Sequence, residues 1–176
     1  PAMRDPNFAR TVTYVCEHTA EGALGIIINR PMNMDLGMIF QQLALTPIDP
    51  DRASQPVLQG GPVSQERGFV LHAVEGGGEG SFDSTLAVTA EIRVTTSQDI
   101  LAAMAAGRGP HRALLALGYA GWGAGQLESE LGQNAWLTVP ARPEILFDIP
   151  FERRWQAAAR LLGIDLATLS SDAGHA

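Results

Sequence analysis

The chain contains no lysine, and all twelve of its basic residues are arginine. A Walker-type phosphate-binding loop needs its lysine, so this class of nucleotide site is excluded. Cysteine is nearly absent as well. Cys16 stands alone, which rules out an intrachain disulfide and agrees with a reducing compartment.

Long apolar runs are also missing. No stretch approaches the roughly 18 consecutive apolar residues of a membrane-spanning helix. Residues 1–5 lack the charged and apolar regions of a signal peptide. We therefore expect a soluble, cytoplasmic protein with no membrane partner. The 176 residues, 45% of them hydrophobic, suit one domain with a sizeable core.

Acidic residues outnumber basic ones, giving a net charge of -7. Phosphate backbones repel such a chain unless its arginines gather on one face, so nucleic-acid binding is disfavoured. A transcriptional regulator that contacts nucleic acid stays open as a rival hypothesis. Its contacts would come from Arg4, Arg10, Arg30, Arg153 and Arg154.

Strand-like runs outnumber helical ones. Strands are predicted at 11–16, 23–29, 57–59, 68–74, 86–88, 91–95, 111–117, 135–139 and 144–148. Helices are predicted at 36–43 behind an Asp35 cap, from 96 or 97 to 106, at 126–131 and from 150 to 162, with a last turn at 166–169. Segments 46–56 and 75–81 are predicted to be loops. This pattern favours an α+β fold, one domain over 1–176, with a mixed, largely antiparallel sheet and a few packed helices.

The predicted final helix carries an apolar stripe that contains Trp155, together with Phe151, Ala158 and Leu162. The stripe is expected to pack against the sheet. Three arginines, Arg153, Arg154 and Arg160, are expected to form the solvated side of the same helix.

Four glycines surround Trp122 within residues 118–130, a segment that follows an apolar run. Glycine permits positive φ and close backbone approach, so a tightly shaped loop holding Tyr119 and Trp122 is predicted. If Gly125 is the N-cap of the next helix, Glu128 lies at N3 and can reach back to the cap N–H group. Helix capping then accounts for the position of Glu128, and no ligand is needed to explain it.

Six segments in order along the chain, at 1–8, 16–25, 29–31, 60–63, 118–130 and 136–137, together resemble the AlgH/YqgE family of small bacterial proteins. The resemblance covers nearly the whole chain. It implies an α+β fold whose bent sheet forms a pseudo-barrel. It implies no defined chemistry, although some family members are labelled transcriptional regulators. The family pattern has an apolar strand ahead of the position of Pro1.

Cys16 and His18 are the candidate catalytic pair. Side chains at i and i+2 of a strand share a face, and a neighbouring imidazole can lower the pKa of a thiol. The alternative is that Cys16 is a small core residue and His18 begins a solvated turn. An orienting group and oxyanion donors are not identifiable, so a Cys/His-dependent enzyme is kept as the rival hypothesis.

Metal and cofactor sites are not predicted. The histidines at 18, 72, 111 and 175 are scattered, without the i, i+4 spacing of a helical zinc site, and there is no second cysteine. The glycine-rich segment also departs from the dinucleotide fingerprint, because Gln126 stands where a third glycine is needed.

We predict a non-catalytic binding or regulatory protein that acts through the surface around Trp122 on an unidentified protein or small molecule. If the strands before Arg30 and before Tyr119 are neighbours with the same direction, Arg30 lies beside both aromatic rings. Alternatively, Trp122 folds over its own loop and Arg30 pairs with an acid. The predicted binding residues are Glu17, His18, Asn29, Arg30, Tyr119, Trp122, Gln126 and Glu128.

Overall fold

The computed structural model describes residues 10–74 and 82–163, so the predictions at 75–81 and 166–169 lie outside this part of the chain. The strands are β1 (Thr13–Thr19), β2 (Gly22–Ile27), β3 (Pro31–Asp35), β4 (Pro56–Gln59), β5 (Val63–Ala73), β6 (Thr85–Ala87), β7 (Ile92–Thr95) and β8 (Ala113–Gly123). The helices are α1 (Leu36–Gln42), α2 (Pro50–Ala53), α3 (Asp99–Ala105), α4 (Gln126–Gly132) and α5 (Arg154–Leu161). A π-helix covers Glu144–Asp148 and a 3₁₀ turn covers Phe151–Arg153.

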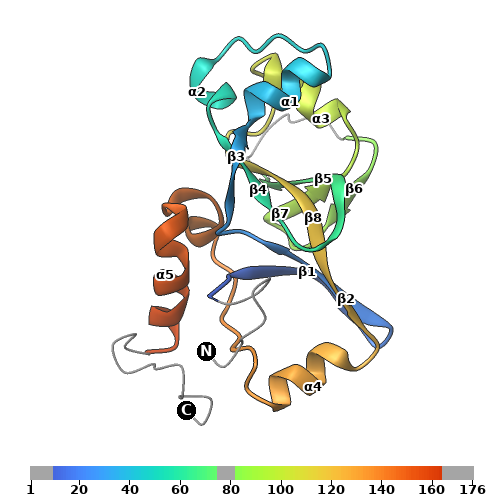
Figure 1. Ribbon diagram of the computed structural model, residues 1–176, viewed down its shortest axis with the longest axis vertical. Coiled ribbons are helices and arrows are strands. Elements are labelled where there is room, and N and C mark those ends of the chain that lie inside the picture. The colour runs from blue at the N-terminus through green and yellow to red at the C-terminus, as the bar shows by residue number, and fades with distance from the viewer. Residues whose placement is uncertain (1–9, 75–81, 164–176) are drawn as a thin grey trace.

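The described strands form one bent sheet in the order β1-β2-β8-β5-β7-β6 (Figure 1). Strand β4 pairs with β8 in parallel. All other pairings, including that of β4 with β3, are antiparallel. The predicted α+β class with a bent, largely antiparallel sheet is therefore confirmed. The extent of the domain, 1–176, stays a prediction.

Strand β8 changes partner at Gly118. Before this residue β8 pairs with β4 and β5. After it, Tyr119 still pairs with Val63 of β5, and residues 120–123 pair with β2. Gly118 has φ +80°, and a Cβ there would collide with the carbonyl oxygen of Gly61. Gly60 donates to Leu117 O and accepts from Ile27 N, both at 2.8 Å. The glycines thus let three strands cross at close range.

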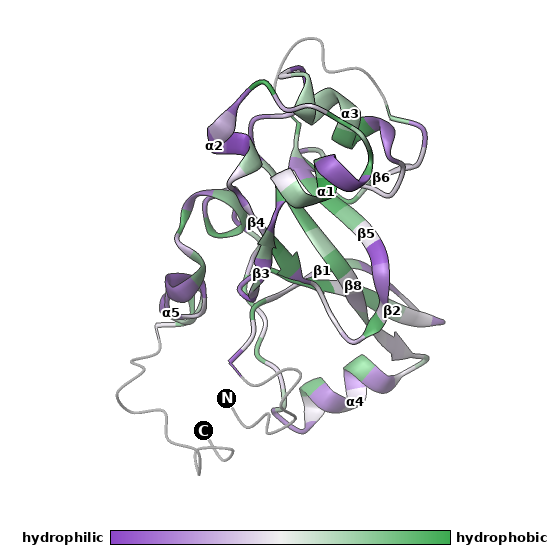
Figure 2. Ribbon diagram, turned by 45° about the horizontal axis from the view of Figure 1, so that its top comes forward, coloured by the Kyte–Doolittle hydropathy of each residue, from purple (hydrophilic) through white to green (hydrophobic). Residues whose placement is uncertain are grey.

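Two apolar cores hold the sheet and helices together. One lies inside the bend of the sheet and is covered by the π-helix through Ile145 and Leu146. The other lies under α1 and α3, which gather with α2 at one end of the sheet (Figure 1). Figure 2 shows apolar stretches of β5 and β8 along the centre of the sheet. The predicted Asp35 cap is confirmed, because its Oδ1 accepts from Met38 N at 3.0 Å.

The sequence prediction is wrong in several elements. The glycine-rich segment is strand rather than loop as far as Gly123, because β2 supplies a complete ladder for it. Residues 135–139 form no strand, and prolines that cannot donate follow at 140 and 143. Residues 144–148 are π-helical. Strand β3 was not predicted, and α2 lies within the predicted loop 46–56.

Arg154 is buried, with 2% of its surface exposed, so the predicted solvated position is wrong. Its guanidinium donates to Ile149 O at 2.9 Å and to Ile28 O at 2.7 Å, and it lies over the Phe151 ring. The carbonyl groups need donors where β2 and the π-helix end, and arginine supplies several.

Helix α5 lies beside the sheet (Figure 1). Trp155 is only half-buried, and Leu162 is 40% exposed, so the predicted stripe is not a closed core contact. Gly163, with φ +69°, follows the helix. No helix in residues 10–74 or 82–163 has the length and apolar character needed to cross a membrane.

Candidate functional site

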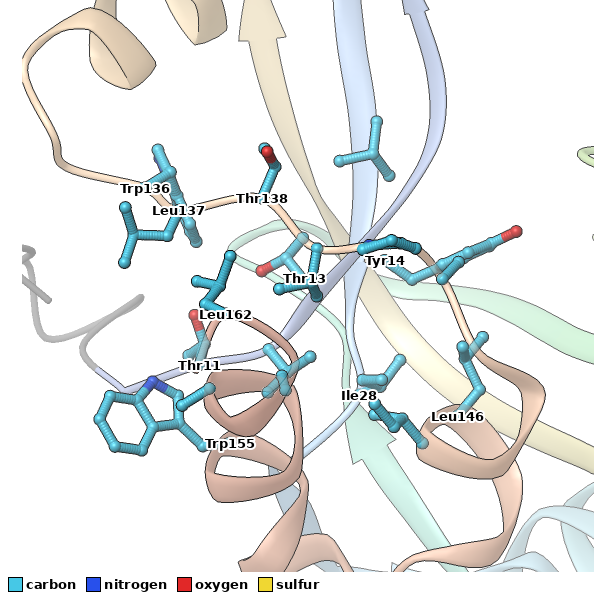
Figure 3. A pocket seen from close by; sticks show the side chains of 18 of the residues that line it. Thr11, Thr13, Tyr14, Ile28, Trp136, Leu137, Thr138, Leu146, Trp155 and Leu162 are labelled. Atoms are coloured by element: carbon cyan, nitrogen blue, oxygen red, sulfur yellow. The ribbon is translucent and has the colours of Figure 1, made fainter. Parts of the chain in front are cut away.

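A cleft of about 400 Å³ opens between β1, the irregular segment 135–142 and helices α4 and α5. Its walls are mainly apolar, and all three tryptophans of the chain line it. Figure 3 shows Trp136 and Leu137 on one side, Trp155 and Leu162 on the other, and Thr13 of β1 between them. Drug-sized ligands bind in clefts of roughly this volume and apolar character.

Glu130 on α4 joins two of the tryptophans. Its Oε1 accepts from Trp122 Nε1 at 3.1 Å and from Trp136 Nε1 at 2.7 Å. Its Oε2 accepts from Gln126 Nε2 at 3.0 Å. The two indole rings stand edge to face, so one carboxylate fixes this wall of the cleft.

Trp122 lies over β2, where its pairing partner is Ala23. A Cβ on Gly25 would come within 3.1 Å of Trp122 Cζ3 and 2.7 Å of Thr13 Cγ2. The missing side chain at Gly25 therefore leaves the space that the indole of Trp122 and the methyl group of Thr13 occupy.

His18 and Glu128 lie at the rim. His18 Nε2 lies 2.7 Å from Glu128 Oε1 and ties β1 to α4 across 110 positions of sequence. This hydrogen bond lowers the pKa of Glu128. Glu128 thus faces His18 instead of reaching back to Gly125, and Gln126 Oε1 takes the Gly123 N–H group at 3.0 Å.

The opposite end of the cleft is built around the start of β1. Asn29 accepts from Val12 N at 2.8 Å and donates to Arg10 O at 3.0 Å, so its amide extends the ladder beyond β2. Arg10 lies with its guanidinium carbon 5.0 Å from the centroid of the Trp155 ring. This cation–π contact holds Trp155 at the wall.

Two buried hydroxyl oxygens of cleft-lining residues have no hydrogen-bond partner within the described residues. They are Thr13 Oγ1 and Tyr14 Oη. Burial, together with the nearby Cys16, raises the pKa of Tyr14 to about 12, so its hydroxyl is neutral. Buried polar groups without partners are uncommon in folded proteins and can pair with a ligand.

Four of the predicted binding residues meet around α4: His18, Trp122, Gln126 and Glu128. The others do not join them. Glu17 is exposed on β1, while Asn29 and Arg30 lie beyond the far end of β2. Tyr119 alternates with Trp122 onto the other face of β8 and packs against Phe69.

Arg30 would lie beside Trp122 only if β2 and β8 were neighbours that run in the same direction. The two strands are neighbours, but they are antiparallel. That pairing sets Ala23 opposite Trp122 and carries Arg30 away from the indole. Arg30 O accepts from Gln59 N at 2.8 Å, which ties it to β4 instead.

Cys16 and His18 do not share a face. The β1–β2 register shifts between Val15 and Glu17, leaving Cys16 as the extra residue of a bulge. Cys16 is 7% exposed in the core, whereas His18 is exposed at the rim. Burial, with Glu17 as the second cause, raises the pKa of the Cys16 thiol to about 12. The reactive thiolate is therefore disfavoured.

Metal ligands do not gather anywhere in the described part of the chain, where no group of three His, Cys, Asp or Glu side chains is placed to hold an ion. Trp136, Trp155, Thr13 and Glu130 were not among the predicted site residues. The i, i+4 spacing of Gln126 and Glu130 was a usable signal for one side of the site. Nothing local in the sequence connects residues 10–15 with 136 and 155.

The AlgH-like family model matches residues 1–167, and the chain belongs to this family. A UPF0301 protein of Saccharophagus degradans is 52% identical over all 176 residues, which cover 84% of its length. A UPF0301 protein of Cupriavidus metallidurans is 55% identical over the same span, with 90% of its length covered.

Two solved structures share the fold. The solution structure of the AlgH protein from Pseudomonas aeruginosa is similar with a TM-score of 0.78 and 52% identity, over 100% of this chain and 91% of that one. The crystal structure of protein DIP2367 from Corynebacterium diphtheriae has a TM-score of 0.69 at 20% identity, over 91% of this chain and 81% of that one. The latter supports the fold alone.

Proposed function

We propose that this protein is a non-catalytic binding protein and that the tryptophan-walled cleft is its ligand site. One observation carries the proposal: all three tryptophans line a single apolar cleft of about 400 Å³. Apolar and aromatic walls with a few polar groups are typical of ligand sites. The ligand is mainly apolar, with polar atoms that pair with hydroxyl groups such as that of Thr13.

The chemistry of the cleft favours binding over catalysis. Among the described residues that line it, the histidine is His18, which lies at the rim with Glu128, and the Cys16 thiol is buried and held protonated. Nucleophilic catalysis requires an activated nucleophile beside its base. A regulatory role would follow if the ligand is a segment of another protein.

The test is binding of anilinonaphthalene sulfonate, an anionic dye whose aromatic part enters apolar sites, followed by dye fluorescence. Ala158 lines the cleft, so Ala158→Glu places a charge among the apolar walls. Gln156 is exposed on the same helix, so Gln156→Glu is a control that adds the same charge outside the cleft.

We expect Ala158→Glu to weaken dye binding about tenfold, or roughly 1.4 kcal/mol, and Gln156→Glu to leave it unchanged. Equal affinity in both variants would place the dye elsewhere and remove the proposed site. Thermal unfolding of each variant verifies that the fold is intact.

A further inference from the structure

A chain of hydroxyl groups ends on the buried side chain of His72. Thr85 Oγ1 donates to the carbonyl oxygen of Phe82 at 3.1 Å. Thr95 Oγ1 lies 2.8 Å from Thr85 Oγ1 and 2.8 Å from His72 Nε2. His72 and Thr95 are only 3% and 0% exposed, so water does not compete for these bonds. The chain thereby connects β5 and β7 to β6 through side chains.

The protons of this chain can be arranged in one way only. A hydroxyl group has a single proton to donate. Thr85 gives its proton to the Phe82 carbonyl, so Thr95 must donate to Thr85. His72 Nε2 must in turn donate to Thr95. The neutral ring therefore carries its proton on Nε2, and Nδ1 carries none.

The bare Nδ1 atom is buried and has no hydrogen-bond partner within residues 10–74 and 82–163. The Phe82 ring stands edge to face with the imidazole, with 5.9 Å between the centroids. A second proton on His72 enters at Nδ1, because Nε2 already holds one. It would create a buried cation whose new N–H group finds no acceptor there, which is costly.

The elements packed around His72 do not offset this charge. Arg93 lies opposite His72 on β7, and its positive charge is the second cause, after burial, that lowers the pKa of His72 to about 4. On β8 the residue opposite His72 is Ala113. At the start of α3, both oxygens of Asp99 already accept hydrogen bonds, among them one from Asp83 N.

The segment that the hydroxyl chain holds is short. Strand β6 has three residues and lies at the end of the described sheet, where it pairs with β7 alone. Its ladder is extended by Thr96 N, which donates to Ser84 O at 2.9 Å, and by Val88 N, which donates to Ile92 O at 3.0 Å. A short edge element of this kind can open without the rest of the fold.

We infer that His72, Thr95 and Thr85 form an acid-sensitive latch that holds segment 82–88 on the sheet. The neutral imidazole closes the latch. A proton at Nδ1 opens it, because the imidazolium reaches water only when Phe82 and β6 move away. Opening uncovers the β7 edge and the part of the second apolar core on which Phe82 packs, while the remaining strands stay paired.

The latch is separate from the proposed ligand site. The residues that line the tryptophan-walled cleft do not include His72, Thr85 or Thr95. The two proposals can therefore fail independently.

The pH range of opening follows from the two states of His72. Its pKa is about 4 in the closed latch and has the ordinary value of 6.5 once the ring reaches water. The closed form keeps its full stability above pH 6.5 and loses it as the pH falls toward 4. The ratio of open to closed molecules should rise about twentyfold between pH 7 and pH 5.

The first measurement is the ¹⁵N chemical shift of each His72 ring nitrogen in the full chain, which distinguishes a protonated nitrogen from a bare one. We expect the proton on Nε2 at pH 7. A proton on Nδ1 at pH 7 would overturn the inference, because the hydroxyl chain would then be arranged differently.

Amide hydrogen exchange measures the opening itself. The amides of Val88 and Thr96 report on the pairing of β6 with β7. The amide of Gly60, which donates to Leu117 O at the centre of the sheet, reports on global unfolding. After correction for the intrinsic exchange rate at each pH, opening at Val88 and Thr96 should rise about twentyfold from pH 7 to pH 5.

Dilute urea separates local opening from global unfolding, because it acts in proportion to the surface that an opening exposes. We expect opening at Val88 and Thr96 to be nearly independent of urea at pH 5. If it depends on urea as steeply as opening at Gly60 does, the proton is taken up only on global unfolding and the latch does not exist.

Two substitutions test the role of the charge. His72→Gln keeps a donor for Thr95 but does not titrate, so the acid response at Val88 and Thr96 should fall below about twofold. Arg93→Gln removes the facing positive charge and should reduce the response. Arg67→Gln is its control, because Arg67 is exposed on the same strand as His72, five residues away, and this variant should keep the full response.

Arg93→Gln leaves the latch itself intact, so the test remains available if His72→Gln does not fold. A full acid response in a folded His72→Gln, or an equal response in the two arginine variants, overturns the inference.

Discussion

The indole rings of Trp122 and Trp136 stand edge to face, with 5.8 Å between their centroids and 75° between their planes. Both donate to the same oxygen of Glu130. A strand, a helix and an irregular segment therefore meet at one carboxylate.

Glu130→Ala should destabilise the fold by about 2 kcal/mol, because it leaves two part-buried indole N–H groups without their carboxylate partner. Glu130→Gln retains an acceptor and should cost less. Urea unfolding followed by tryptophan fluorescence measures both. Equal stability of Glu130→Ala and the wild type would show that the junction contributes nothing.

Arg154→Met keeps much of the buried volume but removes the donors to Ile28 O and Ile149 O. We expect a loss of about 2 to 3 kcal/mol in the free energy of unfolding, since the carbonyl groups become unsatisfied. Arg153 is exposed next to it, and Arg153→Met should stay within about 0.5 kcal/mol of the wild type. Similar values for the two variants would contradict the anchoring role of Arg154.

Cys16 should react slowly with iodoacetamide at neutral pH, because burial raises its thiol pKa to about 12. The raised pKa means that the folded state holds this proton more tightly than the unfolded state. Its contribution to stability is present below the ordinary value of 9 and is lost as the pH rises toward 12. A fast reaction near neutrality, matching that of the unfolded chain, would restore the enzyme hypothesis.

His72 makes the fold sensitive to acid. Its Nε2 lies 2.8 Å from Thr95 Oγ1 between β5 and β7, and burial, with Arg93 as the second cause, lowers its pKa to about 4. The unfolded chain takes up this proton near pH 6.5, so stability should fall as the pH drops from 6.5 to 4.

His72→Gln should lower the number of protons taken up on unfolding by up to about one, which makes the free energy of unfolding less dependent on pH. Chemical unfolding at several pH values measures this slope. Gln41, exposed on α1, provides the non-titrating control Gln41→Ala, which should keep the wild-type slope. An unchanged slope in His72→Gln would mean that His72 does not titrate as described.

The alternation of apolar residues was enough to predict the fold class, and Asp35 was enough to predict the start of α1. The strand across Gly121 and Gly123 was missed because glycine carries no local strand signal and the ladder comes from β2. The apolar run at 144–148 has no period that separates a short strand from a π-helix.

Only the part of the candidate site that depends on short connections along the chain could be predicted from the sequence. His18, Trp122, Gln126 and Glu128 meet because α4 follows β8 directly and β1 is joined to β2 by a short turn. Arg30 was misplaced because sequence does not reveal whether two strands run parallel. The remaining walls come from segments far apart in the chain, and only the tertiary packing brings them together.

The most direct test of the cleft as a binding site uses the three indole N–H signals in a ¹H–¹⁵N spectrum. All three tryptophans line the cleft, so all three signals should shift together as anilinonaphthalene sulfonate is added, with one shared dissociation constant. In Ala158→Glu the same shifts should need about tenfold more dye. If the dye binds while the three signals stay in place, its site lies elsewhere and the account is contradicted.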